Sequence, residues 1–222
     1  MLLRIFKKTK KIFLDLFFPL KCLSCGKVGQ TFCRDCQNKI VALNFKQSPS
    51  GELNGLIIAL DYNQAQVKTA IRFLKYQPFL KILAKDLAGF LIKFIERLTN
   101  EADYFTRNKF VLVPIPLSRK KLAERGFNQS ELVARELSNH FNWPVDKNIL
   151  KKIKNNISQT KLGQKQRKVN VKGVYRVISD VCPQSVILVD DIFTTGATLN
   201  EVAKTLRQAG TKEVWATVLA KD

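Results

Sequence analysis

The chain has 222 residues, 45% of them hydrophobic, so it is long enough for one α/β domain with a small accessory module and is not a disordered polypeptide. Its 38 lysines and arginines against 18 aspartates and glutamates give a formal net charge of +20. That charge predicts a polyanionic partner such as nucleic acid, a nucleotide or anionic lipid. A basic surface that only keeps the protein in solution is the alternative.

The N-terminal residues 1–22 combine basic and apolar side chains. The apolar run from Ile12 to Leu20 contains Asp15 and Pro19 and has no small-residue cleavage site, so we expect no export signal. No apolar run approaches the roughly 18 residues that a membrane span needs. We expect a basic amphipathic helix that packs on the body, or else touches a membrane surface peripherally, in a cytoplasmic protein.

Four of the five cysteines form the pattern C-x2-C-x7-C-x2-C, through Cys22, Cys25, Cys33 and Cys36. Two such pairs can close a tetrahedral zinc site, and four protein ligands leave no open position for water, so the predicted zinc is structural. A redox dithiol is the minor alternative. Clustered thiols suit a reducing cytoplasm better than a disulfide framework. Cys182 stands apart and is expected to be a small buried side chain.

Turn-forming residues cluster between Asn44 and Gly55, which predicts a domain joint there. Residues 1–54 would then hold the basic helix and the zinc module, and residues 55–222 the larger domain.

The larger domain alternates apolar strands with amphipathic helices. We expect strands at Gly55–Tyr62, Phe110–Leu117, Val186–Asp190 and Glu213–Ala220, and helices at Ala65–Tyr76, from Phe79 to about Leu98, at Asn128–Phe141 and from about Leu199 to Gln208. The continuous apolar character of Val186–Val189 is typical of a strand buried on both faces. The predicted fold class is therefore α/β, with a mostly parallel sheet and helices on both faces.

The segment VILVDDIFTTGATL, residues 186–199, places two carboxylates at the end of a buried strand. Ligands of parallel sheets bind at such strand ends, where loops lead into helix N-termini. Asp190 and Asp191 would hold hydroxyl groups or a metal ion, and the loop from Thr194 to Thr198 would hold a phosphate. Ribose 5-phosphate carries both kinds of group, so the residues predict a phosphoribosyl site.

This segment resembles the signature of the type I phosphoribosyltransferases. The resemblance implies that Asp190 and Asp191 hold the ribose hydroxyls of phosphoribosyl pyrophosphate (PRPP) and act in catalysis. It also implies that the 5′-phosphate is held by a loop of five residues: Thr194, Thr195, Gly196, Ala197 and Thr198.

Further motifs resemble the ComF competence family, also called ComFC. They are the CxxCG of the cysteine cluster, FLKY (73–76), VPIPLSRKKLAERGFNQ (113–129) and SQTKLGQKQRKVN (158–170), in the family's order. The resemblance implies a protein that assists uptake of single-stranded DNA in natural transformation, together with a helicase-like ATPase. Lys152 and Asn156 stand where the family usually has Arg and Thr.

Three cations could screen a pyrophosphate: Lys75, Arg119 and Arg125. Transfer would also require Mg²⁺ bound with PRPP. Each of these side chains, taken alone, could equally be a solvated surface charge with no ligand. We expect no hood for an acceptor base after the last strand, so a hood would have to come from the N-terminal part, up to about Asn54.

The stretch 147–179 has ten lysines or arginines and no acidic residue. It could follow a nucleic-acid backbone or fold over PRPP, and the side chains proposed for this contact are Lys161, Lys165, Arg167, Lys168 and Lys172.

Two functions are therefore predicted: handling of single-stranded DNA on a PRPP-binding platform, and, as the alternative, transfer of ribose 5-phosphate to a base, an amine or a nucleic-acid acceptor.

Overall fold

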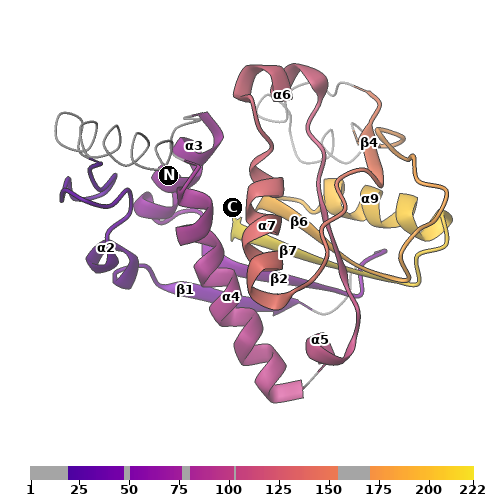
Figure 1. Cartoon of the computed structure of the whole chain (residues 1–222), viewed down its shortest axis with the longest axis horizontal. Helices are drawn as coiled ribbons and strands as arrows, with labels where there is room; N and C mark the ends of the chain where they lie inside the picture. The colour runs from indigo at the N-terminus through magenta and orange to yellow at the C-terminus, as the bar shows by residue number, and fades with distance from the viewer. Residues whose placement is uncertain (1–19, 48–50, 77–80, 103, 155–170) are drawn as a thin grey trace, which may run out of the picture.

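A computed structural model describes residues 20–47, 51–76, 81–102, 104–154 and 171–222, and its centre is a five-stranded sheet of order β1-β2-β7-β6-β3 (Figure 1). The strands of this sheet are β1 (Ala42–Gln47), β2 (Gly55–Asp61), β3 (Val111–Pro114), β6 (Ser185–Phe193) and β7 (Glu213–Lys221). The pairs β2–β7, β7–β6 and β6–β3 are parallel, and β1 joins the edge in antiparallel fashion. The predicted fold class, a mostly parallel α/β sheet, is confirmed.

The central strands are buried because helices cover both faces of the sheet. Residues 186–189 of β6 and 214–220 of β7 are buried throughout. Ile187 and Val189 belong to one apolar cluster and Val186 and Leu188 to the other, as the alternation of side chains along a strand requires. Continuous apolar strands are therefore stable here, where an exposed face would have required polar residues at every second position.

One face of the sheet is covered by α3 (Ala65–Tyr76), α4 (Leu83–Ala102) and α7 (Gln129–Phe141), whose apolar side chains share a cluster with the cysteine segment (Figure 1). The other face is covered by α9 (Ala197–Gln208) and by a ribbon of β4 (Leu150–Lys152) and β5 (Tyr175–Val177). Three short helices complete the described elements: α2 (Arg34–Asn38), α5 (Tyr104–Arg107) and α6 (Arg119–Arg125).

Several elements differ from the sequence-based expectation at their ends. The strand expected to run to Leu117 ends at Pro114, because Pro114 and Pro116 have no N–H to donate to a neighbouring strand. The helix expected from Phe79 to about Leu98 is described from Leu83 to Ala102. Strands β1, β4 and β5 were not expected.

The predicted joint between residues 54 and 55 stays a prediction. β1 lies on its N-terminal side, yet Ala42 pairs with Leu60 and Lys46 with Ile57 of β2. The N-terminal amphipathic helix predicted before Leu20 lies outside the described residues. Among the helices that the structure describes, none combines the length and apolar character needed to cross a membrane.

Candidate functional site

The two carboxylates of the strand-end motif lie near the carboxyl end of β6, beside the end of β3. Val189 precedes them and is paired with Pro114 of β3, and Ile115 N donates to Val189 O over 3.0 Å. The loop that follows leads directly into α9. The location is thus the one where parallel α/β sheets bind ligands.

Asp191 contacts Lys75 at the end of α3, the residue that the sequence analysis proposed as a pyrophosphate contact. Lys75 Nζ lies 3.0 Å from Asp191 Oδ2, and the two side chains are 18% and 8% exposed. The Oδ2 atom is fully buried and accepts no aligned hydrogen bond, so the contact is electrostatic. Removing one partner of such a buried charge pair leaves an uncompensated charge and lowers the stability of the protein.

Asp190 has a different set of partners, although it is adjacent in sequence. Ser130 Oγ on α7 donates to Asp190 Oδ1 over 3.1 Å, and the backbone N–H of Asp191 donates to the same oxygen over 2.9 Å. The two adjacent carboxylates thus meet different helices, Asp190 the start of α7 and Asp191 the end of α3.

The pKa of the Asp190 carboxyl is raised to about 7. Burial is the largest cause, and the neighbouring charge of Asp191 adds to it. The Asp191 N–H, Lys75 and the Ser130 hydroxyl oppose the rise, because they stabilise the ionised form. The acidic pair therefore holds a proton more readily than two free aspartates, and a cation or a set of hydroxyl donors would favour its ionised state.

Two further side chains from the β4–β5 ribbon lie in the electrostatic surroundings of Asp190. The pKa of Lys152 is lowered by burial and by Lys121, and Asp190 opposes this effect. Burial and the charge of Asp190 raise the pKa of Tyr175, and Lys152 Nζ lies 5.5 Å from the centroid of the Tyr175 ring. Lysine at position 152, noted as a departure from the family pattern, thus still places a cation here.

The threonine loop has the backbone that a phosphate site needs. Gly196 has φ 72°, and a Cβ there would lie 2.8 Å from the Phe193 ring, so another residue would be strained and crowded. Asn200 Nδ2 donates to Gly196 O over 3.2 Å, and Ala197 N donates to Thr195 Oγ1 over 3.4 Å. The loop is half-exposed and precedes the N-terminus of the 12-residue helix α9, where N–H groups favour an anion.

The two predicted arginines lie on α6, after β3. Arg119 is exposed at the first residue of this helix. Arg125 donates to Gln129 Oε1 over 2.8 Å, and its guanidinium lies 5.1 Å from the centroid of the Tyr76 ring. Arg125 is thereby brought to the end of α3 that carries Lys75.

Of the side chains proposed for nucleic-acid contact, Lys161, Lys165, Arg167 and Lys168 lie outside the described residues. Lys172 is exposed in the turn before β5. The adjacent Gly173 donates its N–H to Glu201 Oε1 of α9 over 2.6 Å, which ties this turn to the helix that follows the threonine loop.

The four clustered cysteines converge as their spacing predicts. The Sγ atoms of Cys22, Cys25, Cys33 and Cys36 all lie within 4.8 Å of one another. Cys33 N donates to Cys22 Sγ over 3.4 Å, and Cys182 is not part of the group. This donor set can hold a metal such as zinc, for which thiolates in a tetrahedral arrangement are preferred ligands.

The electrostatics of the cluster also fit a cation. Burial raises the pKa of Cys22, but N–H groups of Cys33, Cys25 and Ser24 lower it by more, to about 6. The Ser24 hydroxyl lowers the pKa of Cys36, whereas burial and the three neighbouring thiols raise it to about 12. Once Cys22 is ionised, its negative charge therefore disfavours ionisation of the neighbouring thiols, and a bound metal ion would relieve that repulsion.

Sequence reasoning did not single out Ser130, Lys121 or Tyr175 as site residues. Ser130 directly follows the RGFNQ motif, and Lys121 lies within the segment VPIPLSRKKLAERGFNQ, so their places in the sequence were the available signal. They come from α7, α6 and β5, and only the fold brings these elements to one strand end.

The fold agrees with the comparisons to known proteins. Residues 123–222 match the phosphoribosyl transferase domain family. The chain is similar to Competence protein F of Haemophilus influenzae, with 28% identity over 92% of this chain and 85% of that protein. It is similar to Competence protein ComFC of Bacillus subtilis, with 29% identity over 85% and 72%. It is also similar to the DNA utilization protein YhgH of Shigella flexneri, with 32% identity over 47% of each chain.

Proposed function

The chain belongs to the ComF/ComFC family and carries its phosphoribosyl transferase domain, and from this premise we propose that it handles single-stranded DNA in natural transformation. We also propose that it holds PRPP or a related phosphoribosyl ligand at the ends of β6 and β3. The observation that carries the proposal is that Asp190, Asp191 and the loop with Gly196 in a left-handed conformation lie at one strand end.

The ligand follows from the two kinds of group at the site. Two carboxylates at the end of a strand accept hydrogen bonds from a vicinal diol, as in ribose. The threonine loop and the N-terminus of α9 favour a phosphate. A ribose 5-phosphate unit spans both, with its diol on Asp190 and Asp191 and its phosphate on residues 194–198.

The cations around the acidic pair support a ligand that also carries a pyrophosphate. Lys75 contacts Asp191, Lys152 is near Asp190, and Arg125 lies on Tyr76 beside Lys75. A ligand diol on Asp191 would compete with Lys75 for the carboxylate, and the released ammonium would then be available to the pyrophosphate. Mg²⁺ bound with PRPP would add further neutralisation at the same acidic pair.

Binding of single-stranded DNA is supported by the charge and by the relatives. The formal net charge is +20, and one relative is named a DNA utilization protein. A basic ribbon with few aromatic residues fits a sugar-phosphate backbone better than a sequence of bases. A helicase-like ATPase of the competence machinery is the proposed partner, and the proposed place of action is the cytoplasm, with at most peripheral contact with the membrane.

The four-cysteine cluster is proposed to hold one structural zinc ion. All four ligand positions would be filled by thiolates, so the metal would supply folding energy rather than an activated water. Because the cluster packs against α3, the same metal would also support the helix that carries Lys75.

The DNA-binding proposal is tested by the salt dependence of binding to a fluorescent single-stranded oligonucleotide. We expect log K to fall linearly with log salt concentration, with a slope of about −3 if about four phosphates are neutralised. Salt-independent binding, or none at low salt, would contradict the proposal.

A matched pair of charge reversals locates the DNA surface. Lys172→Glu with Arg176→Glu changes two exposed cations beside β5 and should weaken binding and flatten the salt slope. Lys85→Glu with Lys93→Glu makes the same change in net charge on α4, which covers the opposite face. Equal effects of the two pairs would show that only net charge matters.

Phosphoribosyl ligand binding is tested by calorimetry of PRPP with Mg²⁺. Asp190→Asn with Asp191→Asn should abolish the binding seen in the wild type, while Asp61→Asn, at the end of β2, should leave it unchanged. Equal binding in the wild type and the double variant would reject this part of the proposal.

An active phosphoribosyltransferase is the second candidate function. Lys75 within 3.0 Å of Asp191 favours it, because a buried cation at the acidic pair could neutralise a departing pyrophosphate. Release of label from labelled PRPP with a panel of bases, amines and oligonucleotides is the test. Turnover that is unaffected by the double Asn variant would reject catalysis at this site.

A further inference from the structure

Of the RGFNQS segment, residues 125–130, the proposed function uses only Arg125, yet the segment reaches both carboxylates of the acidic site. We propose that Ser130 is a positioning residue that fixes the orientation of the Asp190 carboxylate, and that RGFNQS is the brace that holds Ser130 in place. This inference rests on the proposed function, because the oriented carboxylate is the one assigned to the ribose.

Ser130 is placed so that its hydroxyl donates to Asp190. Its side chain is fully buried, with 0% exposure, and its Oγ donates to Asp190 Oδ1 over 3.1 Å. The Asp191 N–H donates to the same oxygen over 2.9 Å. The terminal torsion of an aspartate is broad, so two donors on Oδ1 are needed to fix the carboxylate plane. Among the described residues no hydrogen bond reaches Asp190 Oδ2, which leaves that oxygen for a ligand.

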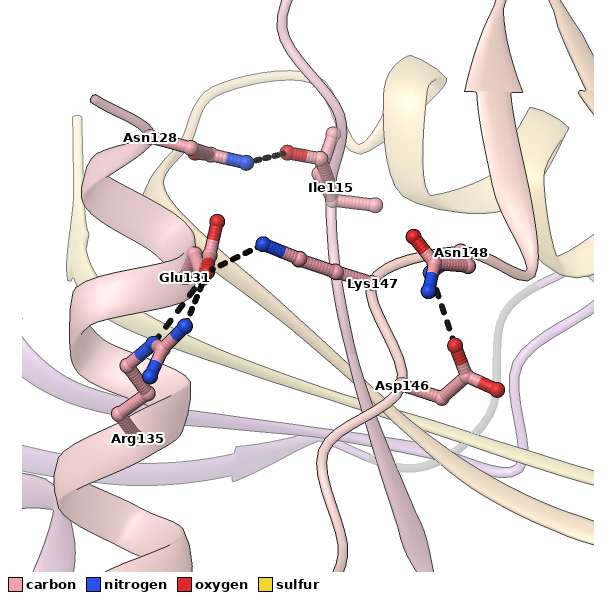
Figure 2. Close-up of polar contacts among 7 residues, drawn as sticks. All are labelled: Ile115, Asn128, Glu131, Arg135, Asp146, Lys147 and Asn148. Atoms are coloured by element: carbon pink, nitrogen blue, oxygen red, sulfur yellow. Dashed lines mark hydrogen bonds and ion pairs between the residues drawn. The ribbon is translucent and has the colours of Figure 1, made fainter. Parts of the chain in front are cut away.

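A closed ring of hydrogen bonds holds Ser130 against β6. Ile115 N donates to Val189 O over 3.0 Å. Asn128 Nδ2 donates to Ile115 O over 3.0 Å (Figure 2). Ser130 N donates to Asn128 Oδ1 over 3.1 Å, so Asn128 both caps α7 and anchors it to β3. The Ser130 hydroxyl then returns to β6 at Asp190, the residue after Val189.

The other end of the segment reaches α3. Arg125 donates to Gln129 Oε1 over 2.8 Å and lies 5.1 Å from the Tyr76 ring centroid. Gly126, with φ 72°, ends α6 in a left-handed conformation and turns the chain toward α7. The six residues therefore connect Asp190 on β6 to the end of α3 that holds Asp191 through Lys75.

The groups that face Asp190 define what a change at Ser130 should do. Asp191 on the same strand raises its pKa, and Lys75 on α3 lowers it. From the ribbon, Asp190 acts on Lys152 of β4 and Tyr175 of β5. The Ser130 hydroxyl stabilises the ionised carboxylate, so its removal should favour the protonated form.

Titration of the Asp190 carboxyl carbon by NMR tests the inference without any ligand. The wild-type midpoint is expected near 7. In Ser130→Ala it should rise by about one pH unit, the range expected for loss of a hydrogen bond to a charged group. Ser130→Thr keeps the hydroxyl and should keep the wild-type midpoint. Ser138→Ala, two turns later on α7, is the matched control and should change nothing.

Calorimetry of PRPP with Mg²⁺ then connects the orientation to binding. We expect Ser130→Ala to weaken affinity about tenfold at pH 6.5 and less at pH 8.5, because the higher pH restores the ionised carboxylate. A wild type that does not bind PRPP would refute the proposed function, while the carboxyl titration would still decide the role of Ser130.

An Asp190 midpoint that is the same in Ser130→Ala and Ser138→Ala would overturn the inference. If Ser130→Ala does not fold, Asn128→Ala provides the second route, because it releases the Ser130 backbone from its anchor. That variant should raise the same midpoint by a smaller amount, and an unchanged midpoint there would also count against the brace.

Discussion

The cysteine cluster and the acidic strand end both crowd ionisable groups together, but they resolve the repulsion in different ways. The four thiols come from 15 consecutive residues and have their Sγ atoms within 4.8 Å of one another. Asp190 and Asp191 instead receive a hydroxyl from α7 and an ammonium from α3. The first arrangement is a local set of thiols that can hold a metal, and the second is a buried carboxylate pair whose charge is balanced by elements distant in sequence.

Helix α3 connects the two regions. Ala65, Gln66 and Thr69 in its N-terminal half lie with Leu23 and Phe32 of the cysteine segment around one small pocket. Lys75, near its other end, contacts Asp191. A change in the cysteine cluster can therefore affect the acidic site through the position of this helix.

Removal of a cysteine ligand is the strongest way to separate the two regions. Cys36→Ser should lose the metal and lower the free energy of unfolding by more than about 4 kcal/mol, because a structural metal contributes folding energy directly. Metal content by mass spectrometry and urea unfolding measure this. Cys182→Ser, outside the cluster, is the control and should keep the metal. Unchanged metal content in Cys36→Ser would show that the cysteine cluster does not hold the metal.

Removal of the buried counter-charge tests the balance at the acidic end. Lys75→Met leaves Asp191 without its cation, so the free energy of unfolding should fall by about 2 kcal/mol, less than for a fully buried pair because Lys75 is 18% exposed. Adding Asp191→Asn should restore most of the loss in urea unfolding. A double variant no more stable than Lys75→Met alone would show that the pair is not coupled.

The pH dependence of stability should carry the signature of Asp190. Its pKa is raised to about 7 in the folded protein, so between about pH 4 and 7 the folded state binds more protons than the unfolded state. Stability from this group is present at low pH and lost as pH rises through 7, at up to on the order of 1 kcal/mol per pH unit. Urea unfolding at pH 5, 6 and 7 should show a flatter profile for Asp190→Asn than for the wild type. Parallel profiles would contradict the raised pKa.

The smallest effect is expected at the ion pair beside the cysteines. Lys27 Nζ lies 2.9 Å from Asp35 Oδ2, nearly the same distance as in the Lys75–Asp191 pair, but the side chains are 64% and 67% exposed. Lys27→Met should therefore change the free energy of unfolding far less than Lys75→Met does, because solvent screens an exposed pair. A loss as large as that of Lys75→Met would show that burial is not what distinguishes the two pairs.

The sequence could predict the elements whose signal is local. Continuous apolar residues predicted β6 and β7, and the two C-x2-C pairs predicted the cysteine cluster, because strands buried on both faces and metal ligands each impose a pattern on neighbouring residues. The ribbon β4–β5 escaped prediction. Each of its strands has three residues, too few for a periodicity, and their pairing, with Leu150 opposite Val177, depends on a partner 27 positions away.

The sequence by itself determined the chemistry that is present: four thiols at metal-binding spacing, two carboxylates at a strand end, and a glycine before the helix that follows them. Only the tertiary structure decided which distant groups serve that chemistry. Ser130, Lys75 and Lys152 reach the acidic pair from α7, α3 and β4. The physical reason is that a charge buried at a sheet end must be balanced by whatever elements pack there, and their approach is set by the fold.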